Sequence, residues 1–314
     1  MVVLKDGVMV HEHYWNGTKE GDTHLMMSVT KSFTSILAAI AVDNGLLNMN
    51  KLAAEYLPEL VDTAWETATV QEIADMRTSL KIEALPGSSW DSRMVDSQGY
   101  YSDEKAAPYP NGINDYFPFI TETVEPMGKK YAYQCVNTEV LGKIVEAATG
   151  KQIPELLETQ IWQKIGVEND AEMMASANGG VMASGGLNAS TKDLARVGKV
   201  ILNEGKNYKG EQVIPKAFID NIYEGNDKVR AAWSLGKEAA LADGWYMNQF
   251  RILYVGDYKV MAMVGIHGQI MVADLESNTV IAMNGGYPMT ETPRMVQGIF
   301  HKTIPAILDA VRAQ

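Results

Sequence analysis

The chain has 314 residues, of which 46% are hydrophobic and 21% are charged, and its formal net charge is −12. This length and composition are typical of an ordinary globular protein with one large domain or two closely joined ones. Nucleic acids and anionic membrane surfaces attract clusters of Lys and Arg, so the acidic balance argues against both partners and favours a small neutral or cationic substrate.

The sequence carries few signals of cellular location. A single cysteine, Cys135, excludes an intramolecular disulfide and slightly favours a reducing compartment. The longest strictly apolar run, ILAAIAV, is far shorter than the roughly 20 residues that span a bilayer. The first residues, MVVLKDGVMV, lack the features of a signal peptide, which favours the cytoplasm, although loss of an upstream segment is equally compatible with them. The oligomeric state is left open, a homodimer included.

The first predicted element is a β-hairpin. Apolar stretches flank Asp6-Gly7, a strong signal for a two-residue turn. His11 and His13 share one face of the second strand. Because no further His, Cys or Asp cluster is nearby, we interpret them as an exposed face, and we expect neither a metal nor a cofactor.

Ser28 and Lys31 stand at the start of the next element, an apolar helix that ends at Asn44-Gly45. Their spacing is just under one helical turn, so the hydroxyl and the amine share a face. The free N–H groups and the dipole of a helix start favour negative charge at the serine. A serine nucleophile with a lysine base needs this arrangement. The alternative is that Ser28 is only a helix cap and Lys31 a surface residue.

The same S-x-x-K spacing recurs at Ser102/Lys105 and at Ser234/Lys237. The first of these lies in a polar run and the second is interrupted by a glycine. Only Ser28 is followed by apolar residues at helical spacing, which are Phe33, Ile36, Leu37, Ile40 and Ala41.

Residues 46–186 are predicted to be mainly helical. The pattern stays helical to Leu80 and includes a capping box at Thr69-x-x-Glu72. Residues 81–128 then lose periodicity and gain aromatic side chains, namely Trp90, Tyr100, Tyr101, Tyr109, Tyr116, Phe117 and Phe119. We expect this long loop either to line a pocket or to form a satellite core.

A later helix is expected to have Asn137 or Thr138 as its cap and Gly150 at its end. Tyr133 and Cys135 would then lie in the preceding loop, a position from which side chains can face a site.

The last third of the chain changes from glycine-rich to helical and then to extended. ANGGVMASGGLNAS is typical of a flexible passage, and Ser190 is expected to cap the helix that follows. From about Phe250, apolar segments between tight turns predict three or four antiparallel strands, and a helix closes the chain. We therefore predict an α+β fold in which residues 1–45 and 187–314 surround one sheet and a mainly helical region, 46–186, is inserted.

Five segments occur in an order that a known superfamily shares. They are SVTKSFTSILAAIAVDNG, ADMRTSL, YAYQCVNTEVLGKIVEAATG, GGLNASTKDLARVGKVILN and VGIHGQIMVAD. On these segments the chain resembles the serine β-lactamase-like superfamily of penicillin-recognising hydrolases. Within it, the chain is most similar to the 6-aminohexanoate-dimer hydrolases and the related family VIII-type carboxylesterases. The resemblance implies a β-lactamase/transpeptidase-like fold.

The resemblance also implies roles for individual residues. Ser28 matches the nucleophile, Lys31 its base, and Tyr133 the catalytic tyrosine of the Y-x-N or Y-x-S element. Cys135 stands where relatives have Asn or Ser, and because a thiol is a poorer hydrogen-bond donor, a substrate contact there is in doubt. Tyr131 is a fallback for the tyrosine, one step out of register.

The family's K-T-G element corresponds to a segment that begins at Met263 instead of lysine. That lysine helps to hold the carboxylate of β-lactams, so its loss argues against a dedicated β-lactamase. The resemblance implies an oxyanion hole formed by the N–H groups of Ser28 and Ile266, with Gly265 kept for close approach of the backbone. His267 either contacts the substrate or completes the end of the strand.

These roles imply a serine hydrolase that cleaves small amides or esters, such as 6-aminohexanoate oligomers, through an acyl-enzyme on Ser28. Lys31 should then be buried and neutral. The alternatives are a D-Ala-D-Ala peptidase or β-lactam-binding protein and, less favoured, a non-catalytic binding module. The substrate is not identified, although Trp233, Trp245 and Tyr246 are expected to shape the pocket.

Overall fold

The structure is a computed structural model that describes residues 1–84, 89–99, 103–110, 112–176, 179–287 and 293–313. Tyr100 and Tyr101 of the predicted aromatic loop and Ser102 of the second S-x-x-K spacing lie outside these residues.

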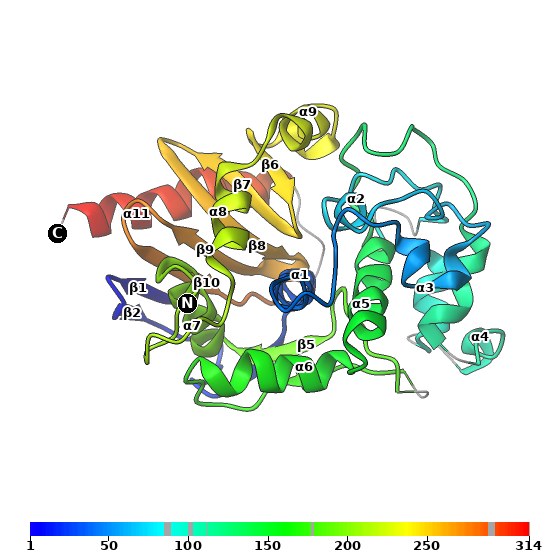
Figure 1. The fold of residues 1–314 in the computed structure, drawn as a ribbon. Helices are drawn as coiled ribbons and strands as arrows, with labels where there is room; N and C mark the ends of the chain where they lie inside the picture. Colours follow the sequence, from blue (N-terminus) through cyan, green and yellow to red (C-terminus); the bar gives the residue numbers. More distant parts are fainter. Residues whose placement is uncertain (85–88, 100–102, 111, 177–178, 288–292, 314) are drawn as a thin grey trace.

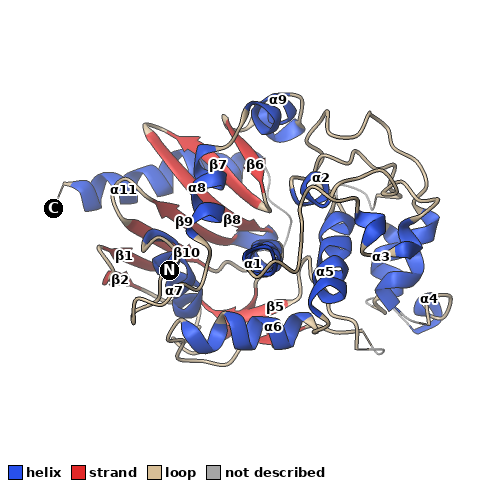
Figure 2. Cartoon of the chain, in the orientation of Figure 1, coloured by secondary structure: helices blue, strands red, loops and turns tan. Residues whose placement is uncertain are grey.

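Both ends of the chain contribute to one antiparallel sheet on one side of the molecule (Figures 1 and 2). Within the described residues its strand order is β2-β1-β10-β9-β8-β7-β6. The strands are β1 (Val2–Lys5), β2 (Val8–Glu12), β6 (Gly244–Met247), β7 (Phe250–Val255), β8 (Tyr258–Gly265), β9 (Gln269–Asp274) and β10 (Thr279–Met283). Val3 of β1 pairs with Ile281 of β10, which confirms the predicted sheet built from the two termini.

The predicted turns of this sheet are confirmed, but one strand is not predicted. Asp6 and Gly7 both have positive φ, 52° and 75°, as a type I′ hairpin turn requires. Strand β6 escapes prediction because its four residues are all buried and do not alternate with polar ones. Asn248 and Gln249, both at positive φ, then form the turn into β7.

Helices pack on both faces of the sheet, and a mainly helical half lies beside it (Figure 1). Those against the sheet are α1 (Val29–Asp43), α7 (Thr191–Leu202), α8 (Lys216–Glu224), α9 (Asp227–Ser234) and α11 (Ile304–Arg312). Helix α10 (Pro293–Gly298) leads into α11 through a π-helical turn at Ile299–Thr303. The helical half contains α2 (Val70–Ala74), α3 (Ser92–Ser97), α4 (Asp103–Ala106), α5 (Cys135–Thr149) and α6 (Ile153–Gln160). The sequence thus predicts the closing helix and the inserted helical region correctly.

The described residues also form short strands and 3-10 segments. A second sheet has the order β3-β5-β4, with β3 (Thr23–Leu25), β4 (Glu172–Met173) and β5 (Leu187–Ser190). The 3-10 segments are η1 (Ala53–Glu55), η2 (Pro58–Leu60), η3 (Gly112–Phe119), η4 (Trp162–Lys164), η5 (Lys237–Ala240) and η6 (Ile266–Gly268). No helix in the described part of the chain is both long and apolar enough to cross a membrane.

Helix α1 lies between the sheet and the helical half, and it is buried on nearly all sides (Figure 1). Two of its buried polar side chains bond to neighbouring backbone. Ser32 Oγ donates to the carbonyl oxygen of Gln249 at 2.7 Å, and Thr34 Oγ1 donates to that of Ala183 at 2.8 Å. Such bonds avoid the cost of unpaired buried groups and fix the orientation of the helix.

Residues 46–80 are less helical than the predicted pattern, although the predicted short helix after Thr69 forms. Only the short 3-10 turns η1 and η2 and the five-residue helix α2 form there. Pro58 removes a backbone donor, and segments this short do not nucleate an α-helix. The predicted capping box is present, because Thr69 accepts from Glu72 N and the Glu72 side chain returns a bond to the Thr69 backbone.

Helix α5 begins earlier than predicted. Its N-cap is Gln134, so Cys135 is the first helical residue rather than part of the preceding loop. Asn137 does not cap the helix because its Oδ1 accepts bonds from Trp65 Nε1 and Thr78 Oγ1, both at 3.0 Å. Tertiary hydrogen bonds therefore use the side chain that the sequence pattern assigns to a cap.

Candidate active site

Ser28 lies at the bend that leads into α1. It occupies the N-cap position, but its side chain makes no capping bond. Met27 before it has φ of 47°, an unusual conformation for a residue other than glycine. The Ser28 hydroxyl is therefore left for other partners, which the helix-cap alternative does not explain.

Lys31 lies one turn later and is 1% exposed. Its Nζ donates to Ser28 Oγ at 2.9 Å and to the carbonyl oxygen of Ser184 at 2.7 Å. The predicted shared face of serine and lysine is thus present, and Lys31 is not a surface residue.

The charge state of Lys31 is set by opposing effects. Burial alone lowers the pKa of Lys31, but the acidic Cys135 and Tyr133 side chains beside it act more strongly in the other direction, so the pKa lies above its ordinary value. The expectation of a neutral Lys31 is not met in the resting site.

Glu139 of α5 binds the backbone segment that holds Lys31. Its carboxylate, 1% exposed, accepts the amides of Ala183 and Ser184, each at 3.0 Å. Burial raises the pKa of Glu139, and the bonds from Ser184 and the charge of Lys31 oppose that rise. Glu139 therefore fixes the segment whose carbonyl group holds the lysine.

Glu139→Gln should shift the position of Lys31 indirectly, through the Ser184 segment that binds it. An amide group would face one backbone N–H with its own NH₂, so we expect the free energy of unfolding to fall by about 1–3 kcal/mol. Displacement of the Ser184 carbonyl should lower kcat/KM by on the order of 10- to 100-fold. Urea denaturation and ester hydrolysis measure the two effects.

Glu146→Gln is the matched control on the same helix. Glu146 also accepts a backbone amide, that of Ile153 at 3.1 Å, and it bonds to Lys143 rather than Lys31. It should lose stability but keep its kcat/KM. Equal activity losses in the two variants would contradict a specific role for Glu139.

Tyr133 and Cys135 reach the same place from the start of α5. The Tyr133 ring is half-buried, and Lys31 Nζ lies 5.2 Å from its centroid. Cys135 is fully buried, and its Sγ lies 3.4 Å from Ser89 Oγ. The structure thus brings Ser28, Lys31, Tyr133 and Cys135 together from segments far apart in the sequence.

Tyr131 does not belong to this group. It is 3% exposed, its ring stacks on Trp233, and its hydroxyl donates to Glu238 Oε1 at 2.8 Å. The fallback role is therefore not supported by its position.

The C-terminal end of β8 closes against the serine. A Cβ added to Gly265 would lie 2.5 Å from the carbonyl oxygen of Met26 and 3.0 Å from Ser28 N, so only glycine fits. Within the described residues, the amides of Ser28 and Ile266 have no hydrogen-bond acceptor. Two amide groups without an acceptor in the described part of the chain, those of Ser28 and Ile266, thus lie where β8 comes closest to the bend before α1.

His267 and Met263 complete the description of this strand end. His267 has φ of 65°, and its Nδ1 lies 2.7 Å from the carbonyl oxygen of Tyr287. A carbonyl only accepts, so Nδ1 carries hydrogen in this contact. His267 therefore completes the turn after β8, and its Nδ1 is used in the hydrogen bond to Tyr287. Met263 is 1% exposed and presents no charge to the site.

The other candidates from the sequence lie elsewhere. Ser234 of the third S-x-x-K spacing is exposed, and its Oγ donates to its own helix at the carbonyl oxygen of Ala231. His11 and His13 are exposed as predicted, and among the described residues no group of three His, Cys, Asp or Glu side chains is placed to hold a metal.

The aromatic loop is at least in part a satellite core. Tyr116 and Phe117 are fully buried, and Phe117 packs edge-on against Trp65 at 5.7 Å between ring centroids. Phe119 is 58% exposed.

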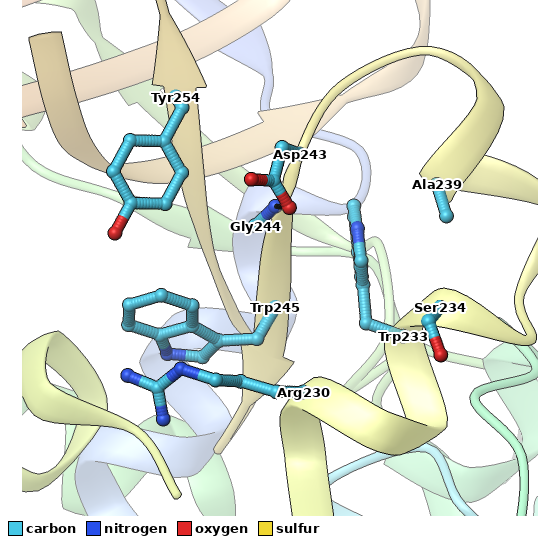
Figure 3. A pocket seen from close by; sticks show the side chains of 8 residues that line it. All are labelled: Arg230, Trp233, Ser234, Ala239, Asp243, Gly244, Trp245 and Tyr254. Carbon is cyan, nitrogen blue, oxygen red and sulfur yellow. Dashed lines mark hydrogen bonds between the residues drawn. The ribbon is translucent and has the colours of Figure 1, made fainter. Parts of the chain in front are cut away.

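A cavity of about 410 Å³ lies away from these groups, between α9 and strands β6 and β7 (Figure 3). Figure 3 shows the Arg230 side chain lying along Trp245, with Tyr254 on the neighbouring strand and Trp233 across β6. Trp233 and Trp245 thus face this cavity, whereas Tyr246 contacts Tyr133 edge-on at 5.9 Å between ring centroids. None of the residues around Ser28 lines the cavity.

Ser184 and Glu139 are not identified from the sequence. Ser184 lies in the glycine-rich passage predicted to be flexible, yet its carbonyl holds Lys31 and the passage continues into strand β5. The signal for Glu139 is weak: an acidic residue next to the apolar positions of the helix segment VNTEVLGKIV. Whether the Glu139 side chain points toward Lys31 depends on how α5 packs, which the sequence does not show.

Comparison with known proteins gives a consistent family. The Beta-lactamase family model matches residues 1–297. The 6-aminohexanoate-dimer hydrolase of Paenarthrobacter ureafaciens is 28% identical over 295 residues, which are 93% of this chain and 73% of that protein.

Solved structures agree with this match. One from Bacillus anthracis, provisionally named a 6-aminohexanoate-dimer hydrolase, has a TM-score of 0.86 and 26% identity, over 98% of this chain and 79% of that one. A D-stereospecific amidohydrolase from Streptomyces has a TM-score of 0.70 and 11% identity, over 96% and 93% of the two chains, and shows the shared fold alone.

Proposed function

The chain belongs to the Beta-lactamase family, whose relatives here are hydrolases, and we propose that it is a serine hydrolase cleaving small amides or carboxylic esters through an acyl-enzyme on Ser28. The observation that carries this proposal is the buried Lys31, which donates to the Ser28 hydroxyl at 2.9 Å. A buried cation held on a serine that caps nothing has no evident structural purpose, whereas an activated nucleophile requires such a partner.

In the proposed reaction, Ser28 Oγ attacks the carbonyl carbon while the Lys31/Tyr133 pair takes its proton. The amides of Ser28 and Ile266 stabilise the negative charge that develops on the carbonyl oxygen. Tyr133 then gives the proton to the leaving amine or alkoxide as the bond to carbon breaks. Water attacks the acyl-enzyme by the same route in reverse and releases the acid.

We place this site where the sheet half, 1–45 and 187–314, meets the helical region 46–186. Ser28, Lys31 and Gly265 come from the first region, and Tyr133 and Cys135 from the second.

For the substrate class we propose linear amides of the 6-aminohexanoate type or small carboxylic esters. The support is the relative named 6-aminohexanoate-dimer hydrolase, which the chain matches over 93% of its length. Turnover of a linear aminohexanoate dimer by the wild type, and loss of that turnover when Ser28 is blocked by a fluorophosphonate, would test this choice. Hydrolysis of p-nitrophenyl esters without the dimer would restrict the activity to esters.

β-Lactams are the competing substrate class. Buried Met263 replaces the lysine that, by family resemblance, holds their carboxylate, so we expect slow or absent turnover of nitrocefin. Rapid turnover of nitrocefin would favour the β-lactamase alternative. A fluorescent penicillin that labels Ser28 and is released slowly would favour the peptidase-like one.

Replacing Tyr133 by Phe should separate amide from ester chemistry. A p-nitrophenolate leaves without protonation, whereas an amine does not, so we expect a loss of about 100-fold or more on the amide and a clearly smaller loss on the ester. The two kcat/KM values of the variant measure this ratio. Equal losses on both substrates would contradict Tyr133 as the proton donor to the leaving group.

A further inference from the structure

Tyr133 lies against a second cation besides Lys31. The side chain of Arg251, from β7, is 12% exposed, and its Cζ lies 4.7 Å from the centroid of the Tyr133 ring. Lys31 Nζ is 5.2 Å from the same centroid. Neighbouring positive charge favours the anionic form of a phenol over the neutral form, and a low local dielectric strengthens the effect.

Arg251 is fixed where it is by Glu238 of η5. Its Nε and one terminal nitrogen donate to the two Glu238 oxygens at 2.7 and 2.8 Å, a bidentate pair. Glu238 Oε1 also accepts the hydroxyl of Tyr131. Tyr131 stacks in turn on Tyr246, with 5.0 Å between ring centroids. The guanidinium therefore cannot turn away from Tyr133 without breaking a mostly covered ion pair.

The Arg251–Glu238 pair is ionised. Burial alone lowers the pKa of Arg251, but Glu238 outweighs it, and the pKa lies well above its usual value. Burial alone raises the pKa of Glu238, but Arg251 brings it below its ordinary value. Arg251 thus keeps its charge throughout the working range of an enzyme.

We propose that Arg251, held by Glu238, is a positioning residue that prepares Tyr133 to accept the proton of Ser28. The inference deepens the proposed function and rests on it. As the bond from Ser28 Oγ to the carbonyl carbon forms, the hydroxyl proton passes to Tyr133 Oη, while Lys31 and Arg251 keep theirs. Tyr133 later returns this proton to the leaving group, which leaves Ser28 acylated, and hydrolysis of the acyl-enzyme by water then restores Ser28.

A substrate-binding role fits Arg251 less well. Its bidentate edge is already used by Glu238, and its guanidinium faces the rings of Tyr133 and Tyr246. The cation therefore acts on a reacting side chain rather than on a ligand.

The titratable groups around Tyr133 come from several elements. They are Lys31 of α1, Cys135 of α5, Tyr246 of β6 and Arg251 of β7, with Glu238 and Tyr131 behind Arg251. Arg251 and Glu238 can be changed without altering Ser28, Lys31 or Tyr133 themselves.

The test is the pH profile of kcat/KM for p-nitrophenyl butyrate, a substrate without a carboxylate. Loss of a proton from the Lys31/Tyr133 pair activates the site, so activity rises with pH. Arg251→Met removes a favourable charge, and its midpoint should move up by about one pH unit, a tenfold loss below the midpoint that recovers above it. Arg251→Lys should move the midpoint less. Glu238→Gln leaves Arg251 unopposed, and its midpoint should move down.

The midpoint is expected to rise in Arg251→Met and to fall in Glu238→Gln, and misfolding alone would not produce shifts in opposite directions. A merely structural role would lower kcat/KM by one factor at every pH in all three variants, and that result would overturn the inference. So would a rise in KM confined to carboxylate-bearing substrates. Arg230→Met is the matched control, because Arg230 also lies over an aromatic ring, 4.1 Å from that of Trp245, but does not contact Tyr133 (Figure 3). Its midpoint should stay at the wild-type value.

Failure of this inference can be told apart from failure of the proposed function. A wild type that labels on Ser28 and hydrolyses the ester, with an unmoved midpoint in Arg251→Met, overturns the role of Arg251 alone. A wild type that neither labels nor turns over any ester or amide overturns both.

Discussion

Ser28→Ala is expected to reduce kcat/KM for p-nitrophenyl butyrate by about 10⁴-fold or more, as removal of a catalytic serine does in hydrolases with an acyl-enzyme. The loss should be confined to chemistry. The Ser28 side chain makes no capping bond, and Lys31, which donates to it, keeps its bond to the Ser184 carbonyl. The variant should therefore fold and unfold at a urea concentration close to that of the wild type.

Ser234→Ala is the matched control for this result. It removes the hydroxyl of another S-x-x-K spacing, one that bonds only within its own helix, and should leave kcat/KM unchanged. Intact-mass measurement after treatment with a fluorophosphonate adds an independent readout, since one adduct is expected on wild type and on Ser234→Ala but none on Ser28→Ala. Ester turnover that survives in Ser28→Ala would remove the proposed nucleophile, whatever the labelling shows.

The fold is largely predictable from the sequence because its signals are local. Asp6-Gly7 has the residues that a type I′ turn needs, and the strands after Phe250 are separated by equally clear turns. Where the structure differs from prediction, a tertiary contact overrides a local preference. Asn137, a good helix cap by type, is used instead to bind Trp65 and Thr78.

Local spacing predicts only the Ser28/Lys31 pair of the site. Ser28 and Lys31 are adjacent on one helix turn, so spacing alone can suggest them. Glu139 bonds to Ser184 and Arg251 lies over the Tyr133 ring, in each case from a segment far away in the sequence. No local pattern shows which of these buried groups will come into contact. Burial of Lys31 is predicted, but the rise in its pKa is not, because that rise depends on Cys135, the first residue of α5, and on Tyr133 just before that helix.

The glycine at the end of β8 allows a second decisive prediction, which concerns the oxyanion hole. Gly265 has φ of −120° and ψ of 147°, an ordinary extended conformation that any residue adopts. Glycine is therefore required at position 265 for lack of space and not for backbone conformation. A single methyl group there would lie 2.5 Å from the carbonyl oxygen of Met26 and 3.0 Å from Ser28 N, so either the strand or the bend must move.

Gly265→Ala should consequently lower kcat/KM by about 100- to 1000-fold, the loss typical of one disabled oxyanion donor. The strain should also reduce the free energy of unfolding by about 1–3 kcal/mol, which urea denaturation measures. Gly286→Ala is the control, because Gly286 lies in the segment after β10 with no atom within 4 Å of an added Cβ, and both quantities should stay near wild type. If Gly265→Ala loses stability but hydrolyses esters at the wild-type rate, the strand end is a packing contact only. The oxyanion donors must then be sought away from Ile266.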